Sequence, residues 1–108
     1  VLMLRQAINL GGEESGIYFN LGGALEGTGD DTAAVTAYQE ALTLAPENPK
    51  PYYNLGLLYE RRGKTAKALE AYRHFLSLWH GSEQFKTVVQ NRIATLARVP
   101  YKSPGIQD

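Results

Sequence analysis

The stretch Tyr18-Phe19-Asn20-Leu21-Gly22 returns 34 residues later as Tyr52-Tyr53-Asn54-Leu55-Gly56. Positions further along return with the same spacing: Gly29, Ala34, Ala37, Tyr38, Leu42 and Leu44 correspond to Gly63, Ala68, Ala71, Tyr72, Leu76 and Leu78. A fixed period of this length is typical of a solenoid, in which each unit buries its apolar face against its neighbours. The period therefore predicts stacked helical units.

Each copy of the repeat has the pattern of two helices joined by a glycine turn. Apolar and small residues recur at the spacing of one helix face, both before and after the turn glycine. In the first copy Tyr18, Leu21, Gly22 and Leu25 are expected to face inward, Gly29 to make the turn, and Asp30 or Asp31 to cap the next helix.

Gly22 and Gly56 lie at the same phase of the two copies, in the middle of a predicted helix. A glycine there costs about 1 kcal/mol relative to alanine. Its recurrence predicts that the paired helix approaches closely, with the tyrosine of that helix across the gap.

Across residues 15–82 this pattern resembles the tetratricopeptide-repeat family. The resemblance rests on Tyr18, Leu21, Gly22, Gly29, Ala34, Tyr38, Ala41 and Pro46, and then on Tyr52, Leu55, Gly56, Tyr59, Gly63, Ala68 and Tyr72. It implies an all-α, right-handed superhelical solenoid of antiparallel helix pairs with a C-terminal capping helix. The second copy departs from the pattern, with Phe75 in place of Ala41 and His80 in place of Pro46, so we expect the next element to pack differently.

The period divides the chain into five segments. We expect the second helix of a truncated preceding repeat at 1–12, repeats at 15–48 and 49–82, a capping helix at 82–98 and an irregular tail at 99–108. The tail is either disordered or an arm docked on a partner. Because Leu4, Ala7 and Ile8 correspond to Tyr38, Ala41 and Leu42, they are candidates for an end-on contact. We also expect the chain to be a piece of a longer protein.

The sequence offers no set of residues for catalysis or for holding a metal. It has no cysteine, and its two histidines, His74 and His80, do not share a helix face at i, i+4 spacing. No nucleophile elbow or phosphate-binding glycine loop occurs. We therefore expect no enzyme activity, no catalytic, metal-binding or cofactor-binding residues, and no cofactor.

The charge of the chain and the length of its apolar runs also limit which classes of partner we expect. The cluster Arg61, Arg62, Lys64 and Lys67 has no aromatic stacking platform beside it, and net charge is zero, so nucleic-acid binding is not expected. No apolar run reaches the length of a membrane span, so membrane insertion by this segment is not expected. The compartment stays open: a cytoplasmic location is slightly favoured over a periplasmic or secreted one.

In the resembled family, the first helix of each pair lines a concave groove that binds a partner. The corresponding candidates are Phe19, Asn20, Gly23, Glu26, Lys50, Tyr53, Asn54, Leu57, Glu60 and Arg61. Asn20 and Asn54 share one phase, and an amide there can bond the backbone of a peptide or remain solvated. Phe19 and Gly23 replace the Lys and Asn with which some members clamp a carboxylate, so that mode is disfavoured.

These features predict a non-catalytic protein–protein interaction scaffold, part of a larger assembly, that binds a peptide or partner helix. The alternative is a structural module that self-associates as a homo-oligomer through its open N-terminal end. Residues 11–48 carry seven acids and no Lys or Arg, whereas 49–108 carry ten bases and four acids. This asymmetry is either chance on solvated faces or a dipole that orients a partner or a second copy.

Overall fold

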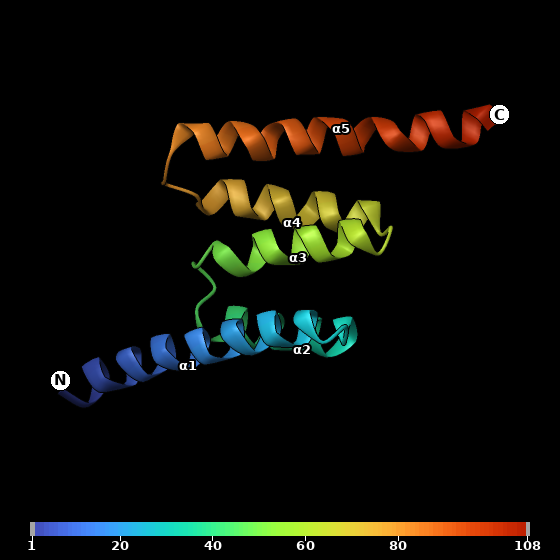
Figure 1. Ribbon diagram of the computed structural model, residues 1–108. Coiled ribbons are helices and arrows are strands. Elements are labelled where there is room, and N and C mark those ends of the chain that lie inside the picture. Colours follow the sequence, from blue (N-terminus) through green and yellow to red (C-terminus); the bar gives the residue numbers. More distant parts are fainter. Residues whose placement is uncertain (1, 108) are drawn as a thin grey trace. The chain divides into compact units, whose positions relative to one another are not determined.

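The computed structural model describes the backbone of residues 2–107 and the side chains of residues 12–98. It contains the helices α1 (Leu2–Gly27), α2 (Asp31–Leu44), α3 (Lys50–Arg61), α4 (Thr65–Leu78) and α5 (Glu83–Gln107) (Figure 1), and no strand occurs over 2–107. The expected all-α helical-repeat fold is confirmed. The chain divides into two compact units, Val1–Pro51 and Tyr52–Asp108.

In the first unit α1 packs against α2 through the predicted close approach. A Cβ built on Gly22 would lie 2.5 Å from Cε1 of Tyr38, whose side chain is fully buried. The turn between the two helices places Gly29 at a φ of 88°, a conformation that favours glycine. The predicted cap is also present, because the carboxylate of Asp30 accepts a hydrogen bond from the Ala33 N–H at 3.2 Å.

In the second unit α3 and α4 repeat this arrangement. The ring of Tyr72 takes the space that a side chain on Gly56 would need, and the turn glycine Gly63 has a φ of 77°. Helix α5 is then capped by Ser82, whose hydroxyl accepts a hydrogen bond from the Phe85 N–H at 3.0 Å. It packs on α4 through a core made of Ala68, Tyr72, Phe75, Val89 and Leu96.

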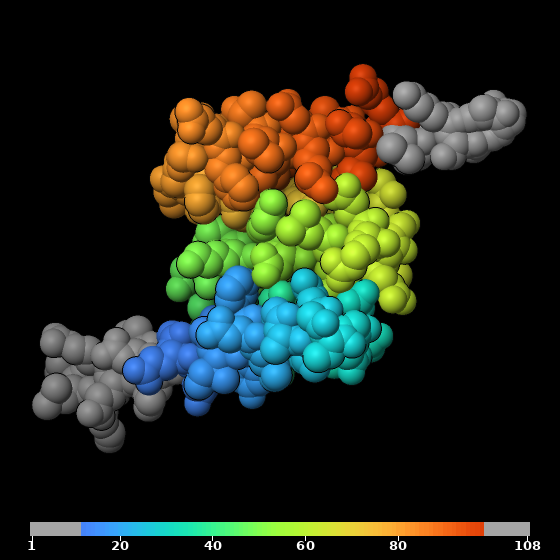
Figure 2. Space-filling model, viewed as in Figure 1, coloured from blue at the N-terminus to red at the C-terminus, as the bar shows by residue number. Residues whose placement is uncertain are grey.

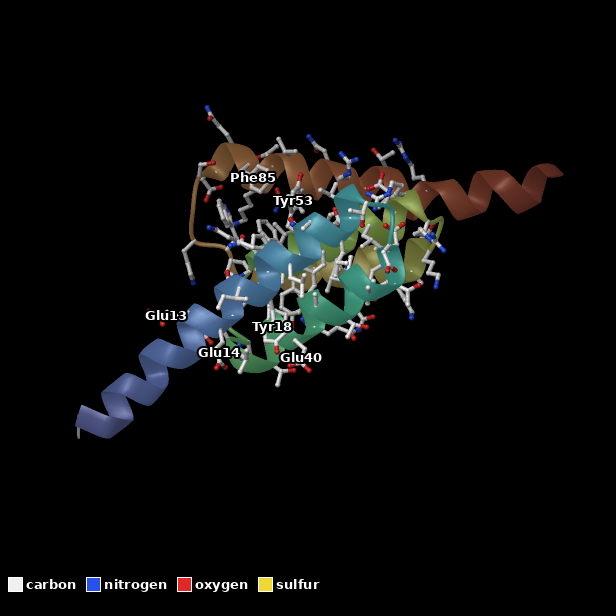
Figure 3. All side chains as sticks on the ribbon, turned by 60° about the horizontal axis from the view of Figure 1, so that its bottom comes forward. Glu13, Glu14, Tyr18, Glu40, Tyr53 and Phe85 are labelled. Carbon is white, nitrogen blue, oxygen red and sulfur yellow. The ribbon has the colours of Figure 1, made fainter. Side chains whose placement is uncertain are left out.

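An aromatic cluster fills the region where α4 leads into α5. The ring centroid of Phe85 lies 5.1 Å from that of Tyr53, 5.4 Å from that of Trp79 and 5.7 Å from that of Phe75. Tyr53 and Phe85 can be followed side by side in Figure 3. Phe75 stands where the first repeat has the small Ala41, so its larger ring supplies the centre of this cluster.

The structure differs from the expected division of the chain at both ends. Helix α1 continues from the segment 1–12 into the repeat at 15–48, where two separate helices were expected, because the glycines Gly11 and Gly12 weaken a helix but keep their N–H donors. Helix α5 continues to Gln107 through Pro100 and Pro104, where an irregular tail was expected. Proline has a φ close to the helical value, so the backbone can continue at the loss of a hydrogen bond.

The predicted inward face of α1 is only partly buried. Leu21 is 45% exposed and Ile17 is 63% exposed, so the expectation that Leu21 faces inward is wrong in this unit. The physical reason is that α2 covers the side of α1 that carries Gly22, whereas no described residue packs over Ile17 and Leu21 enough to bury them. The expected end-on contacts Leu4, Ala7 and Ile8 have side chains outside the described residues.

Candidate partner-binding surface

A hollow lies between α3 and α5 in the second unit. Its volume is about 310 Å³, and its lining consists of Glu60 from α3 and Val88, Asn91, Arg92, Thr95 and Leu96 from α5. Both helices reach the face of this unit shown in Figure 2, where α3 is green and α5 is orange. Val88 is 50% exposed, so an apolar side chain is open to solvent at this hollow.

A hydrogen-bonded network fixes the wall of this hollow. Oε1 of Glu60 accepts a hydrogen bond from the hydroxyl of Tyr72 at 2.8 Å and another from Nε of Arg92 at 2.8 Å. Burial of Tyr72, followed by its hydrogen bond to Glu60, raises the pKa of this tyrosine well above its usual value of 10.0. The hydrogen bond to Glu60 raises the pKa of Arg92 as well. The carboxylate is thus held in place from both sides.

The candidates from the first repeat lie on α1 in different environments. Phe19 is half-buried, with its ring centroid 5.8 Å from that of Tyr38, whereas Asn20 and Gly23 are exposed. Glu26 is half-buried, and its Oε2 atom is buried with no hydrogen-bond partner among the described residues. A buried oxygen without a donor costs about 1–3 kcal/mol. This oxygen atom can therefore accept a hydrogen bond from another molecule.

The candidates from the second repeat divide into three groups. Lys50 and Arg61 are exposed, and Asn54 is half-buried and makes an interaction of its own. Tyr53 and Leu57 pack against the core of the second unit, so much of their surface serves the fold. Glu60 alone of these candidates lines the hollow described above.

Sequence reasoning missed the contribution of α5 to this hollow. Val88, Asn91 and Thr95 lie 34 residues after Asn54, Leu57 and Arg61, which were all groove candidates. The period therefore contained the signal, because extending it by one more copy would have selected these three residues. Arg92 corresponds to Leu58, so no likeness within the repeat could have identified it.

The chemistry available on this surface suits binding. The hollow combines an exposed valine, an amide, a hydroxyl and a guanidinium group that is already paired. Within residues 12–98, no three His, Cys, Asp or Glu side chains gather closely enough to hold a metal ion. None of the described helices combines the length and the apolar character needed to cross a membrane.

Comparison with known families identifies the repeat. A family model described as TPR repeat matches residues 28–63, and a second described as tetratricopeptide repeat matches residues 49–78. No curated protein matches the chain. The two matched ranges cover the second helix of the first pair and both helices of the second pair, where each turn glycine and each buried tyrosine has its expected place. Over residues 28–78 this chain belongs to the tetratricopeptide-repeat family.

Proposed function

We propose that this chain is a non-catalytic scaffold that binds a peptide or a helix of a protein partner along the first helices of its repeats. Tetratricopeptide repeats generally mediate protein–protein interactions. The observation that carries the proposal here is the hollow between α3 and α5, where the exposed Val88 lies beside a carboxylate that is held in place.

The lining of the hollow indicates which partner side chains it suits. An apolar side chain can pack on Val88 and Leu96, while Asn91 and Thr95 offer hydrogen bonds to a peptide backbone. Because Glu60 already neutralises Arg92, a partner carboxylate gains little there. The hollow therefore favours a mixed apolar and polar segment over an acidic tail.

Glu26 supports the same proposal from the first repeat. It has the same phase as Glu60, but no hydrogen bond satisfies its buried Oε2 atom among the described residues. A partner N–H donor at this position would meet that need and gain a charge-assisted hydrogen bond. We thus expect the bound segment to bring a donor, such as an amide or a basic side chain, to Glu26.

The experiment compares partner capture by the wild-type chain and by three double variants. Val88→Ser with Asn91→Ala changes the hollow, and Asn20→Ala with Asn54→Ala changes the repeated amides. The control, Arg73→Ala with Ser77→Ala, changes the lining of a separate hollow on α4. Each immobilised protein is exposed to the same lysate, and retained proteins are identified by mass spectrometry.

The expected result is at least one protein that the wild type and the control retain and the first variant loses. Its purified form should bind the first variant about tenfold more weakly, which corresponds to a loss of about 1.4 kcal/mol. If all four chains capture every protein equally, the hollow is not part of the binding surface. If the asparagine variant captures as much as the wild type while the first variant does not, only the two amides are excluded from it.

The alternative is self-association through the N-terminal end, and one observation favours it. Ile17 and Leu21 are exposed together on α1, so a second copy could bury them. Sedimentation at low and high salt distinguishes the two functions. A chain that stays monomeric in both conditions excludes self-association and leaves the scaffold proposal unaffected.

A further inference from the structure

The first unit carries an exposed apolar stripe on α1, formed by Ile17 and Leu21. Ile17 is 63% exposed and Leu21 is 45% exposed, and their spacing of four residues places both on one face of the helix. A hollow of about 270 Å³ lies beside this stripe, lined by Glu14, Ile17 and Tyr18. Single exposed apolar residues are common on protein surfaces, whereas a contiguous pair beside a hollow indicates an interaction surface.

The same face of the repeat is buried where it recurs. One period after Ile17 and Leu21 lie Pro51 and Leu55 of α3, and both are buried. The pattern of the repeat thus produces a face that is covered in α3 and open in α1. Covering the stripe on α1 would remove apolar surface from water, which favours association.

Helix α4 shows which kind of element covers this face. Val89 of α5, two periods after Leu21, is fully buried in a cluster with Ala68, Tyr72 and Phe75 of α4. These three residues follow one another at spacings of four and three, so they form the apolar stripe of an amphipathic helix. The element that fits the open face of α1 is therefore a helix with a similar stripe.

Acidic side chains flank the stripe on α1. Glu13 and Glu14 precede Ile17 by four and three residues, so at about 100° per residue they lie on either side of it around the helix axis. Both are exposed, and Figure 3 shows them projecting from α1, with Glu40 projecting from α2. Residues 11–48 contain seven acids and no Lys or Arg. This negative surface favours a helix that carries Lys and Arg beside its apolar stripe.

A second copy of the chain offers no such helix among its described side chains. Within residues 12–98, the large apolar side chains that are exposed are Ile17, Leu21 and Val88. Two copies that paired through their α1 stripes would bring Glu13 and Glu14 of both copies together, because such a pairing is isologous. Val88 is a single residue and forms no stripe. The occupant with matching charge and pattern is therefore a helix of a different protein.

We propose that the stripe formed by Ile17 and Leu21 binds an amphipathic helix of another protein, with Lys or Arg beside its apolar face. Apolar side chains of that helix enter the hollow beside Tyr18, and its cations pair with the flanking glutamates. Leu21 follows Asn20 by one residue, so it lies about 100° around α1 from this groove candidate. The stripe and its flanking glutamates include none of the groove candidates, so the two surfaces can be tested separately.

Three synthetic peptides of about 18 residues test this proposal, a length at which a helix can form. The first carries leucine at alternating spacings of three and four and lysine elsewhere. The second has glutamate in place of every lysine, and the third has the composition of the first in an order that forms no stripe. Binding to the wild-type chain is measured by fluorescence anisotropy at low and high salt. The lysine peptide should bind more tightly than the other two, and its binding should weaken in salt.

Two double variants assign this binding to α1. Ile17→Ser with Leu21→Ser should weaken binding of the lysine peptide at least about tenfold, because the apolar contact is lost. Both residues are exposed, so circular dichroism should show an unchanged fold. Glu13→Lys with Glu14→Lys should lower the affinity for the lysine peptide and raise the affinity for the glutamate peptide. This second variant keeps the test informative if the first one disturbs folding.

The matched control is Val88→Ser with Asn91→Ala, which changes the hollow between α3 and α5 and should bind the lysine peptide like the wild type. The proposal is overturned if the wild type does not bind the lysine peptide, if it binds the glutamate peptide equally, or if the control loses binding as the serine variant does. Unchanged binding by the serine variant overturns it as well. Sedimentation tests the other occupant, because self-association that Ile17→Ser with Leu21→Ser abolishes would assign the stripe to a second copy. None of these outcomes removes the hollow of the second unit from the scaffold function.

Discussion

The ring of Tyr72 occupies the space that a Cβ atom at Gly56 would need. The same relationship joins Tyr38 and Gly22 in the first unit, where the atoms would lie 2.5 Å apart. Both tyrosines are fully buried, so neither ring can move away into solvent. The repeated glycine is therefore a packing requirement between two helices, and its cost to helix formation is offset by that contact.

Replacing Gly56 by alanine should destabilise the chain even though alanine is the better helix former. Overpacking a filled core typically costs about 1–3 kcal/mol, which outweighs the gain of about 1 kcal/mol in helix propensity. The free energy of unfolding, measured by circular dichroism in urea, should fall. The control is Gly16→Ala, because a Cβ at Gly16 meets nothing within 4 Å and should be neutral or stabilising. Equal effects at the two positions would contradict the packing argument.

The period predicts local structure well because each helix pair carries its own signals. The glycine turns, a cap at Asp30 or Asp31 and the tyrosines that pack on glycine were all predicted from spacing and residue type. These features depend on neighbours within one pair of helices, or at a single helix start. The sequence places such neighbours at fixed distances along the chain.

Features that depend on a third helix were harder to predict. Leu21 has the same pattern as the buried Leu55, yet it is 45% exposed, because burial needs a covering helix as well as an apolar residue. The hollow beside Glu60 depends on α5, whose Arg92 has only a leucine as its counterpart in the preceding repeat. A pattern within the repeat cannot supply contacts that occur only once.

The two hydrogen bonds to Glu60 should differ in strength. Tyr72 is fully buried, and a hydrogen bond to a charged group contributes about 1.5–3 kcal/mol. The side chain of Arg92 is 42% exposed, and such surface pairs contribute about 0–1 kcal/mol and weaken in salt. Double-mutant cycles with Tyr72→Phe, Arg92→Ala and Glu60→Ala, measured by urea unfolding at low and high salt, give both coupling energies. A larger and salt-independent coupling for Arg92 would reverse this order.

Alkaline pH should destabilise the chain through Tyr72. Burial and the hydrogen bond to Glu60 raise the pKa of Tyr72 in the folded state above its ordinary value of 10.0. Above that pH the unfolded chain releases this proton while the folded chain retains it. The contribution is therefore fully present below about pH 10 and is lost as pH rises toward the folded pKa. In urea unfolding between pH 9 and 11, Tyr72→Phe should show a smaller decline than the wild type, and equal declines would argue against this origin.

The two glutamates at the same phase of the repeat should respond oppositely to one substitution. Oε2 of Glu26 is buried and has no hydrogen-bond partner among the described residues, so Glu26→Gln loses no hydrogen bond at that atom and should raise the free energy of unfolding by about 1 kcal/mol. Glu60→Gln weakens two hydrogen bonds to a charged acceptor and should lower it by a similar amount. Urea unfolding of the two variants measures both changes.

A gain in stability at Glu26 should come with a loss of binding. If the carboxylate is kept for a donor on the partner, Glu26→Gln should bind the captured protein several-fold more weakly in calorimetry while unfolding at higher urea. Higher stability together with weaker binding would identify a carboxylate that contacts the partner. A carboxylate that is only unsatisfied could be replaced with no effect on affinity. Equal destabilisation by Glu26→Gln and Glu60→Gln would show instead that Glu26 has a stabilising partner of its own, and would remove it from the binding surface.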